Sequence, residues 1–200
     1  MTANEIEPIY REVSDMAWNF LSGASQYVVL SRCDYLMGRA YAYEERKNEA
    51  RSRYDSGVNY AERAMKIQES AEAWVMLAEN ISQSCTVRPA SYAMANGLKV
   101  EKYSKNALDI NGRYAAARFL IAARWVYAPS PFNNYNRGIQ MLTDIQDNSD
   151  MEKDDMFNIY LAIGYGYMQQ KNAAAARLWF SRASEVYPTN KYVQSLLAGL

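Results

Sequence analysis

The stretch "LAIGYGYMQQKNAAAARLWFSRASEVYP", residues 161–188, places small residues, aromatic residues and a proline at regular intervals. Gly164 and Tyr167 are three residues apart, and Ala176 and Phe180 are four apart. Steps of three and four residues return to the same side of a helix, so each pair shares one helix face. The stretch therefore predicts two amphipathic helices that pack against each other.

Gly164 predicts how closely these two helices approach. A glycine inside a helix costs about 1 kcal/mol relative to alanine, and a helix tolerates this cost where a neighbour must come close. We expect Phe180 to fill the space that Gly164 leaves. Asn172 is a suitable N-cap for the second helix, and Pro188 ends that helix because its ring cannot continue the hydrogen-bond ladder.

The pattern resembles the tetratricopeptide repeat (TPR). In this family an aromatic residue, a Leu-Gly pair and a tyrosine on a first helix are followed by Ala, Phe, Ala and Pro on a second. The resemblance implies a helical hairpin stacked on other hairpins, while an ordinary helical hairpin in a bundle is the alternative. The residues that carry the resemblance are Tyr160, Ile163, Gly164, Tyr167, Ala176, Phe180, Ala183 and Pro188.

Earlier segments contain weaker copies of the motif, with Gly38, Ala78 and Ala122 in the place of Gly164. Four repeats are predicted, and their spacings of 40, 44 and 42 residues exceed the usual length of about 34. We assign about ten of the surplus residues to the region of "SCTVRPASYA", residues 84–93. The predicted repeats start near residues 31, 71, 115 and 157.

The second helix of the first copy is assigned to Gly57, Ala61 and Ala64, which have the same spacing as Ala176, Phe180 and Ala183. This assignment lengthens the first hairpin by about seven residues relative to the last one. A HEAT-like array is the alternative with a suitable period, but it lacks the aromatic and glycine pattern.

These patterns predict an all-α fold. We expect a single TPR-like domain over residues 1–200, a right-handed superhelix of antiparallel helical hairpins with about four irregular repeats. An amphipathic helix over residues 5–22 is expected to cover the first repeat, and residues 191–200 to cover the last, because the outermost faces of a repeat array need a cap.

Composition excludes several kinds of function. The chain contains 22 basic and 22 acidic residues, so its net charge predicts neither a nucleic-acid partner nor an anionic membrane surface. It has no histidine, which removes the commonest general base and metal ligand, so we expect no enzyme, no cofactor and no metal site. Cys33 and Cys85 are expected to be separate thiols, and no segment is apolar enough to insert into a membrane.

Tyrosine is abundant, with 17 residues, and several tyrosines lie beside the core positions of a first helix. In the TPR family such positions line the inner, concave surface, where tyrosine offers contact area and a hydroxyl group for binding. Half-buried tyrosines that fill joints between helices are the alternative. The residues expected on the inner surface are Arg39, Tyr43, Glu79, Gln83, Tyr127, Tyr165 and Gln169.

The sequence therefore predicts a non-enzymatic interaction scaffold that binds a protein or peptide in its groove. Chaperone-binding TPR proteins carry a lysine and asparagine set that grips a terminal carboxylate. Tyr35 and Arg39 stand where such residues are expected, so a chaperone adaptor is not predicted. Homo-oligomerisation is left open.

A second resemblance gives an alternative function. The segments "GVNYAERAM" and "ALDINGRYAAARFLIAARWVY", with the proline-rich break after Trp125, look like the TPR lipoproteins associated with TRAP transporters. That likeness implies a bacterial periplasmic accessory protein that pairs with a solute-binding protein. As printed, the chain predicts a cytoplasmic location, and a removed leader would place it in the periplasm.

Overall fold

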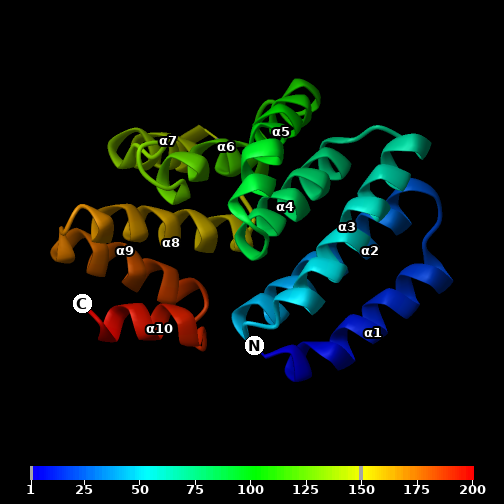
Figure 1. Ribbon diagram of the computed structural model, residues 1–200, viewed down its shortest axis with the longest axis horizontal. Coiled ribbons are helices and arrows are strands. Elements are labelled where there is room, and N and C mark those ends of the chain that lie inside the picture. The colour runs from blue at the N-terminus through cyan, green and yellow to red at the C-terminus, as the bar shows by residue number, and fades with distance from the viewer. Residues whose placement is uncertain (1, 149–150) are drawn as a thin grey trace. The chain divides into compact units, whose positions relative to one another are not determined.

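The computed structural model describes residues 2–148 and 151–200, and within these ranges it contains helices and no strands (Figure 1). This confirms the predicted all-α fold. Contacts divide the chain into two compact units, Met1–Asn111 and Gly112–Leu200, while the prediction of one domain stays a prediction. The helices are α1 (Ala3–Phe20), α2 (Gly23–Tyr43), α3 (Lys47–Ile67), α4 (Ala71–Val87), α5 (Ala90–Ile110), α6 (Ala115–Tyr127), α7 (Tyr135–Asn148), α8 (Lys153–Gln169), α9 (Ala173–Val186) and α10 (Lys191–Ala198).

The α8–α9 hairpin confirms the predicted close contact. A Cβ atom built on Gly164 would lie 2.5 Å from Cδ1 of Phe180, so only glycine lets this ring approach. Phe180 is fully buried between the two helices. Asn172 caps α9 as expected, because its Oδ1 accepts a hydrogen bond from the backbone N–H of Ala175 at 3.1 Å.

We expect a Gly164→Leu substitution to overpack this joint and to lower the free energy of unfolding by about 1–3 kcal/mol. The added side chain must displace the Phe180 ring, which has no free space around it. Thermal denaturation checks the effect, with Gly97→Leu as the control, because a Cβ on Gly97 meets no heavy atom within 4 Å. An unchanged melting temperature for Gly164→Leu would count against the hairpin register.

The α2–α3 hairpin repeats this geometry and corrects the sequence assignment. Gly38 contacts the ring of Tyr54, and these residues are 16 positions apart, as are Gly164 and Phe180. Ala50, Tyr54 and Gly57 are buried and therefore occupy the places assigned to Gly57, Ala61 and Ala64.

The turns of the two hairpins are also equivalent. Glu45 and Lys171 both adopt a φ of 60°, in the left-handed region. The next residue in each turn donates its backbone N–H to a tyrosine carbonyl, from Arg46 to Tyr41 at 2.9 Å and from Asn172 to Tyr167 at 3.0 Å. The first hairpin is therefore not lengthened, and the predicted seven extra residues are wrong.

In the first two hairpins the surplus residues lengthen the second helices instead. Helix α3 has 21 residues where α9 has 14, and its stripe of buried residues continues through Ala61 and Ala64. Helix α5 also has 21 residues and begins at Ala90, three residues after α4 ends. The surplus residues that the sequence places near residues 84–93 thus form extra helical turns at the start of α5.

A pair of side chains that joins the two helices recurs in three hairpins. In α8–α9 it is an aromatic pair, with the rings of Tyr160 and Trp179 5.7 Å apart, and Trp74 stacks on Tyr103 at 5.2 Å in α4–α5. In α2–α3 the same positions hold an ion pair. Residues 34 and 53 have the spacing of residues 160 and 179, and Nη1 of Arg53 lies 3.1 Å from Oδ1 of Asp34.

Helix α1 packs on α2, where Ala3 and Ala17 are buried. The hydroxyl of Tyr10 donates to Asp34 at 3.1 Å and accepts from Arg53 at 2.6 Å, so the polar pair of the first hairpin also holds α1. Burial is the main reason that the pKa of Tyr10 is raised to about 12, so this hydroxyl keeps its proton at neutral pH.

Helix α10 packs on α9 at the other end of the chain. Val193 is fully buried against the cluster that contains Phe157 and Phe180, and Leu196 and Leu197 pack around it. We expect removal of residues 191–200 to expose this cluster, to lower the melting temperature and to promote association. Light scattering and thermal denaturation check the result, and a monodisperse, equally stable truncated protein would show that α10 is not a cap.

Candidate functional site

The seven predicted inner-surface residues lie on first helices of hairpins. In the Met1–Asn111 unit α2 packs against α4, and in the Gly112–Leu200 unit α6 packs against α8. We call these two pairs of neighbouring helices the α2–α4 wall and the α6–α8 wall. The predicted residues are Arg39 and Tyr43 on α2, Glu79 and Gln83 on α4, Tyr127 on α6, and Tyr165 and Gln169 on α8.

The α6–α8 wall brings Tyr127 and Tyr165 together. Their ring centroids are 5.1 Å apart with an interplanar angle of 45°, a tilted aromatic contact between two helices. Tyr127 keeps 48% of its surface exposed, and Tyr165 is half-buried. Gln169 lies one turn after Tyr165 and is exposed. The pair thus presents an accessible aromatic surface with no formal charge.

Tyr192 of α10 lies near Tyr165 and was not among the predicted residues. Burial raises the pKa of Tyr192, and the nearby hydroxyl of Tyr165 raises it further. The Tyr192 side chain is still partly exposed. Sequence spacing gives no signal for this proximity, because residues 191–200 are predicted only as a cap and follow a separate turn.

The α2–α4 wall is polar. Nη1 of Arg32 lies 3.2 Å from Oε2 of Glu79, and only 8% of the Glu79 surface is exposed. Arg39 is half-buried, and its Nη1 donates to the hydroxyl of Tyr35 at 3.4 Å. The guanidinium groups of Arg32 and Arg39 lie 5.7 and 5.6 Å from the centre of the Tyr35 ring.

Arg32 and Tyr35 are therefore parts of this wall that the sequence prediction left out. A signal for them exists, because Arg32, Tyr35 and Arg39 are spaced by three and four residues and so share one helix face. Burial raises the pKa of Tyr35, and the negative charge of Glu79 adds to the rise, so the Tyr35 hydroxyl stays neutral.

Two predicted residues lie farther along the same helices. Tyr43 stands at the C-terminal end of α2 with its ring exposed, and Gln83 is half-buried one turn after Glu79. The binding role of all seven predicted residues stays a prediction.

Among residues 2–148 and 151–200, no three His, Cys, Asp or Glu residues form a group that suits a metal ion. Cys33 and Cys85 are free thiols, as expected, and burial raises the pKa of each. Both thiols are thus held in the protonated, weakly nucleophilic form.

No helix among the described residues combines the length and the apolar character that crossing a membrane requires.

Comparisons with known proteins find similarity in solved structures alone. No protein-family model matches the chain, and no curated protein matches it. The structure described as "YrrB: a TPR protein with an unusual peptide-binding site" is 14% identical, with a TM-score of 0.44. The match covers 96% of this chain and 84% of that one.

The structure of the APC/C hetero-tetramer Cut9-Hcn1 is 12% identical, with a TM-score of 0.46, and the match covers 98% of this chain and 39% of that one. The chain itself folds into successive helical hairpins, and in two of them Gly38 and Gly164 each receive an aromatic ring from the second helix.

Proposed function

We propose that this protein is a non-enzymatic, TPR-type scaffold that binds a protein or peptide segment on the first helices of its hairpins. The observation that carries the proposal is the accessible contact between Tyr127 and Tyr165 on two neighbouring first helices. Tyrosine gives large contact area at a low cost in side-chain entropy and offers a hydroxyl for hydrogen bonding. These properties suit recognition of an extended chain.

The two walls, each taken by itself, suit ligand groups of different chemistry. The α6–α8 wall presents tyrosine rings and Gln169, which suits apolar or aromatic ligand side chains and their neighbouring amides. The α2–α4 wall presents two guanidinium groups and one carboxylate around Tyr35, which suits polar ligand groups. We therefore propose that apolar ligand side chains bind on the α6–α8 wall.

The transporter-accessory alternative rests on sequence resemblance alone. No family model matches the chain, either for this function or for the scaffold. The scaffold proposal has the more direct support, because the tyrosine contact is a feature of the folded chain.

The proposal is tested with peptides selected from a display library of short linear sequences on the immobilised protein. We expect a Tyr127→Ala/Tyr165→Ala double variant to bind the selected peptides at least 2 kcal/mol more weakly, roughly 30-fold in Kd, because the anchor surface is removed. Fluorescence anisotropy measures the affinity, and circular dichroism confirms that the variant is folded.

Leu178→Ala is the matched control, because Leu178 is an exposed apolar residue on the second helix α9. Its affinity should remain unchanged. Equal binding by the double variant, loss of binding in the Leu178 variant, or a library that yields no binder would each contradict the proposal.

A further inference from the structure

Two helices of the Met1–Asn111 unit carry apolar side chains that the unit itself does not cover. On α1 these are Ile9, Met16 and Phe20, with Phe20 79% exposed, and their spacings of seven and four place them on one face. On α5 they are Met94 and Leu98, 83% and 71% exposed and one turn apart. We call these the α1 stripe and the α5 stripe.

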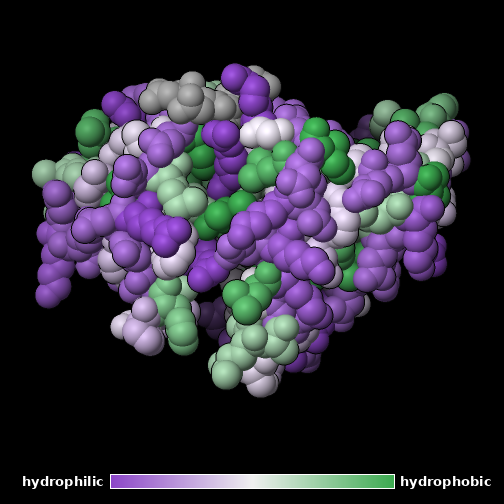
Figure 2. All heavy atoms as spheres, turned by 90° about the horizontal axis from the view of Figure 1, so that it is seen from above, coloured by the Kyte–Doolittle hydropathy of each residue, from purple (hydrophilic) through white to green (hydrophobic). Residues whose placement is uncertain are grey.

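Such exposure needs an explanation, because methionine, leucine and phenylalanine lose favourable burial energy in water. On the face that Figure 2 displays, hydrophobic residues reach the surface in patches among hydrophilic ones. The α5 stripe lies at the start of α5, in the helical extension that is additional to the TPR-like hairpin. A Cβ on Gly97 would meet no heavy atom within 4 Å, so this part of α5 is open on that side as well.

The two stripes have flanks of opposite charge. Glu12 and Asp15 are exposed beside the α1 stripe, and Lys99 and Lys102 are exposed beside the α5 stripe. An open depression on α5 is lined by Leu98, Glu101, Lys102, Lys105 and Asn106.

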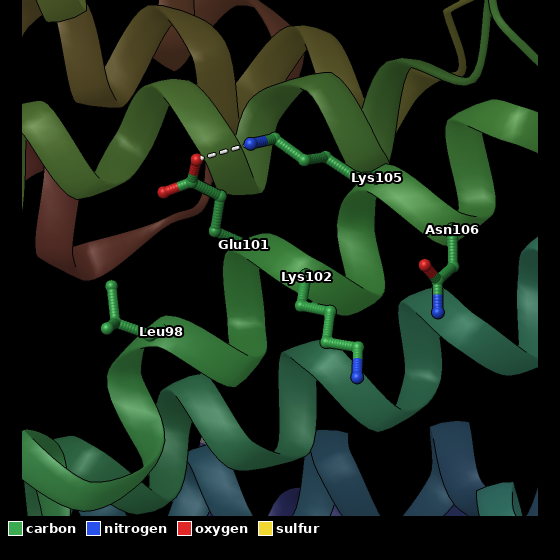
Figure 3. A pocket seen from close by; sticks show the side chains of 5 residues that line it. All are labelled: Leu98, Glu101, Lys102, Lys105 and Asn106. Carbon is green, nitrogen blue, oxygen red and sulfur yellow. Dashed lines mark ion pairs between the residues drawn. The ribbon is translucent and has the colours of Figure 1, made fainter.

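Figure 3 shows this part of α5 at close range. Nζ of Lys105 lies 2.8 Å from Oε1 of Glu101, and the pair runs along the helix near Leu98, while Lys102 points away from the pair. The one acidic side chain in this depression is thus matched by Lys105. Lys99 and Lys102 then give the α5 stripe a positive flank.

We infer that the α1 stripe of one copy of this chain packs on the α5 stripe of a second copy. Pairing α1 with α5 buries apolar side chains on both sides and brings acidic flanks to basic ones. Pairing α5 with α5 would oppose Lys99 and Lys102 with their own copies, and pairing α1 with α1 would oppose Glu12 and Asp15. Charge therefore favours an interface between two different surfaces of the same chain.

Because the interface joins two different stripes, each stripe can be disrupted separately. Phe20→Asp places a charge in the α1 stripe, and Met94→Asp places one in the α5 stripe, at positions exposed enough to leave folding intact. We expect each variant alone to self-associate roughly tenfold or more weakly than the natural chain. An equimolar mixture recovers dimers, because the Met94→Asp chain keeps a complete α1 stripe and the Phe20→Asp chain keeps a complete α5 stripe.

Sedimentation equilibrium over a range of protein and salt concentrations tests the inference on the full chain. The natural chain should associate reversibly, and more weakly as salt screens the charged flanks. Leu178→Asp, on the exposed face of α9, should leave association unchanged. A natural chain that stays monomeric, a single variant that still associates fully, or a mixture that fails to form dimers would each overturn the inference.

Discussion

Phe180→Ala is expected to lower the free energy of unfolding by about 3–5 kcal/mol. The ring is fully buried against Gly164, and glycine offers no side chain that can fill the space after the ring is removed. The cavity therefore persists and adds its cost to the lost burial of the ring. Chemical denaturation measures the change.

The matched control is Phe132→Ala, because Phe132 is 68% exposed in the segment between α6 and α7. That substitution should change the free energy of unfolding by no more than about 0.5 kcal/mol. Similar losses for the two variants would mean that Phe180 is not the centre of the α8–α9 hairpin.

Arg53→Ala is expected to lower the free energy of unfolding by about 3 kcal/mol at neutral pH. This loss is at the lower end of the range for breaking a buried ion pair. The substitution leaves the carboxylate of Asp34 buried with only the hydroxyl of Tyr10 beside it. An exposed pair provides the control: Arg11→Ala removes the partner of Glu7 at the surface and should cost less than about 1 kcal/mol.

The pH dependence follows from the same carboxyl group. Burial raises the pKa of Asp34 even in the presence of Arg53, and loss of the guanidinium removes an interaction that lowers this pKa. The folded state then binds a proton more readily than the unfolded state, so stability falls as pH rises through the interval between the two pKa values. The loss in the free energy of unfolding caused by Arg53→Ala should therefore be smaller at acidic pH. Adding Asp34→Asn to the Arg53→Ala variant should recover part of that free energy at neutral pH.

The α8–α9 hairpin was predictable because each of its signals has one physical interpretation. Gly164 inside a helix requires a close neighbour, Asn172 is a strong N-cap, and Pro188 cannot continue a helix. The α2–α3 hairpin was misassigned because α3 continues its buried stripe beyond the hairpin. Residues 50, 54 and 57 have the same spacing as residues 57, 61 and 64, so spacing alone fits both registers.

The sequence at the turn of the first hairpin does not reveal the correct register of α3. Glu45 adopts a left-handed backbone conformation, which is usual for glycine and asparagine. Because the residue here is glutamate, the sequence does not predict a turn at this position. The ion pair of Asp34 and Arg53 was hidden for a related reason, because it occupies positions where the last hairpin has aromatic rings. Its partners become evident only when the register of α3 is known.

The candidate site was predictable to the extent that it depends on repeat position. Tyr127 and Tyr165 were selected because they lie beside the core face of first helices, and neighbouring first helices bring them into contact. Tyr192 was missed because its place beside Tyr165 depends on how α10 packs, which helical spacing does not determine. Arg32 was missed because its partner Glu79 lies on the next hairpin.

Amide chemical-shift mapping by NMR with a selected peptide shows whether a ligand binds to the first helices. In the Gly112–Leu200 unit we expect the largest shifts in α6 and α8, around Tyr127 and Tyr165, and small shifts on the exposed faces of α7 and α9. The shifts around Tyr165 should disappear in the Tyr127→Ala/Tyr165→Ala variant. Shifts concentrated on α9 around Leu178, with α6 and α8 unaffected, would contradict the proposed binding surface.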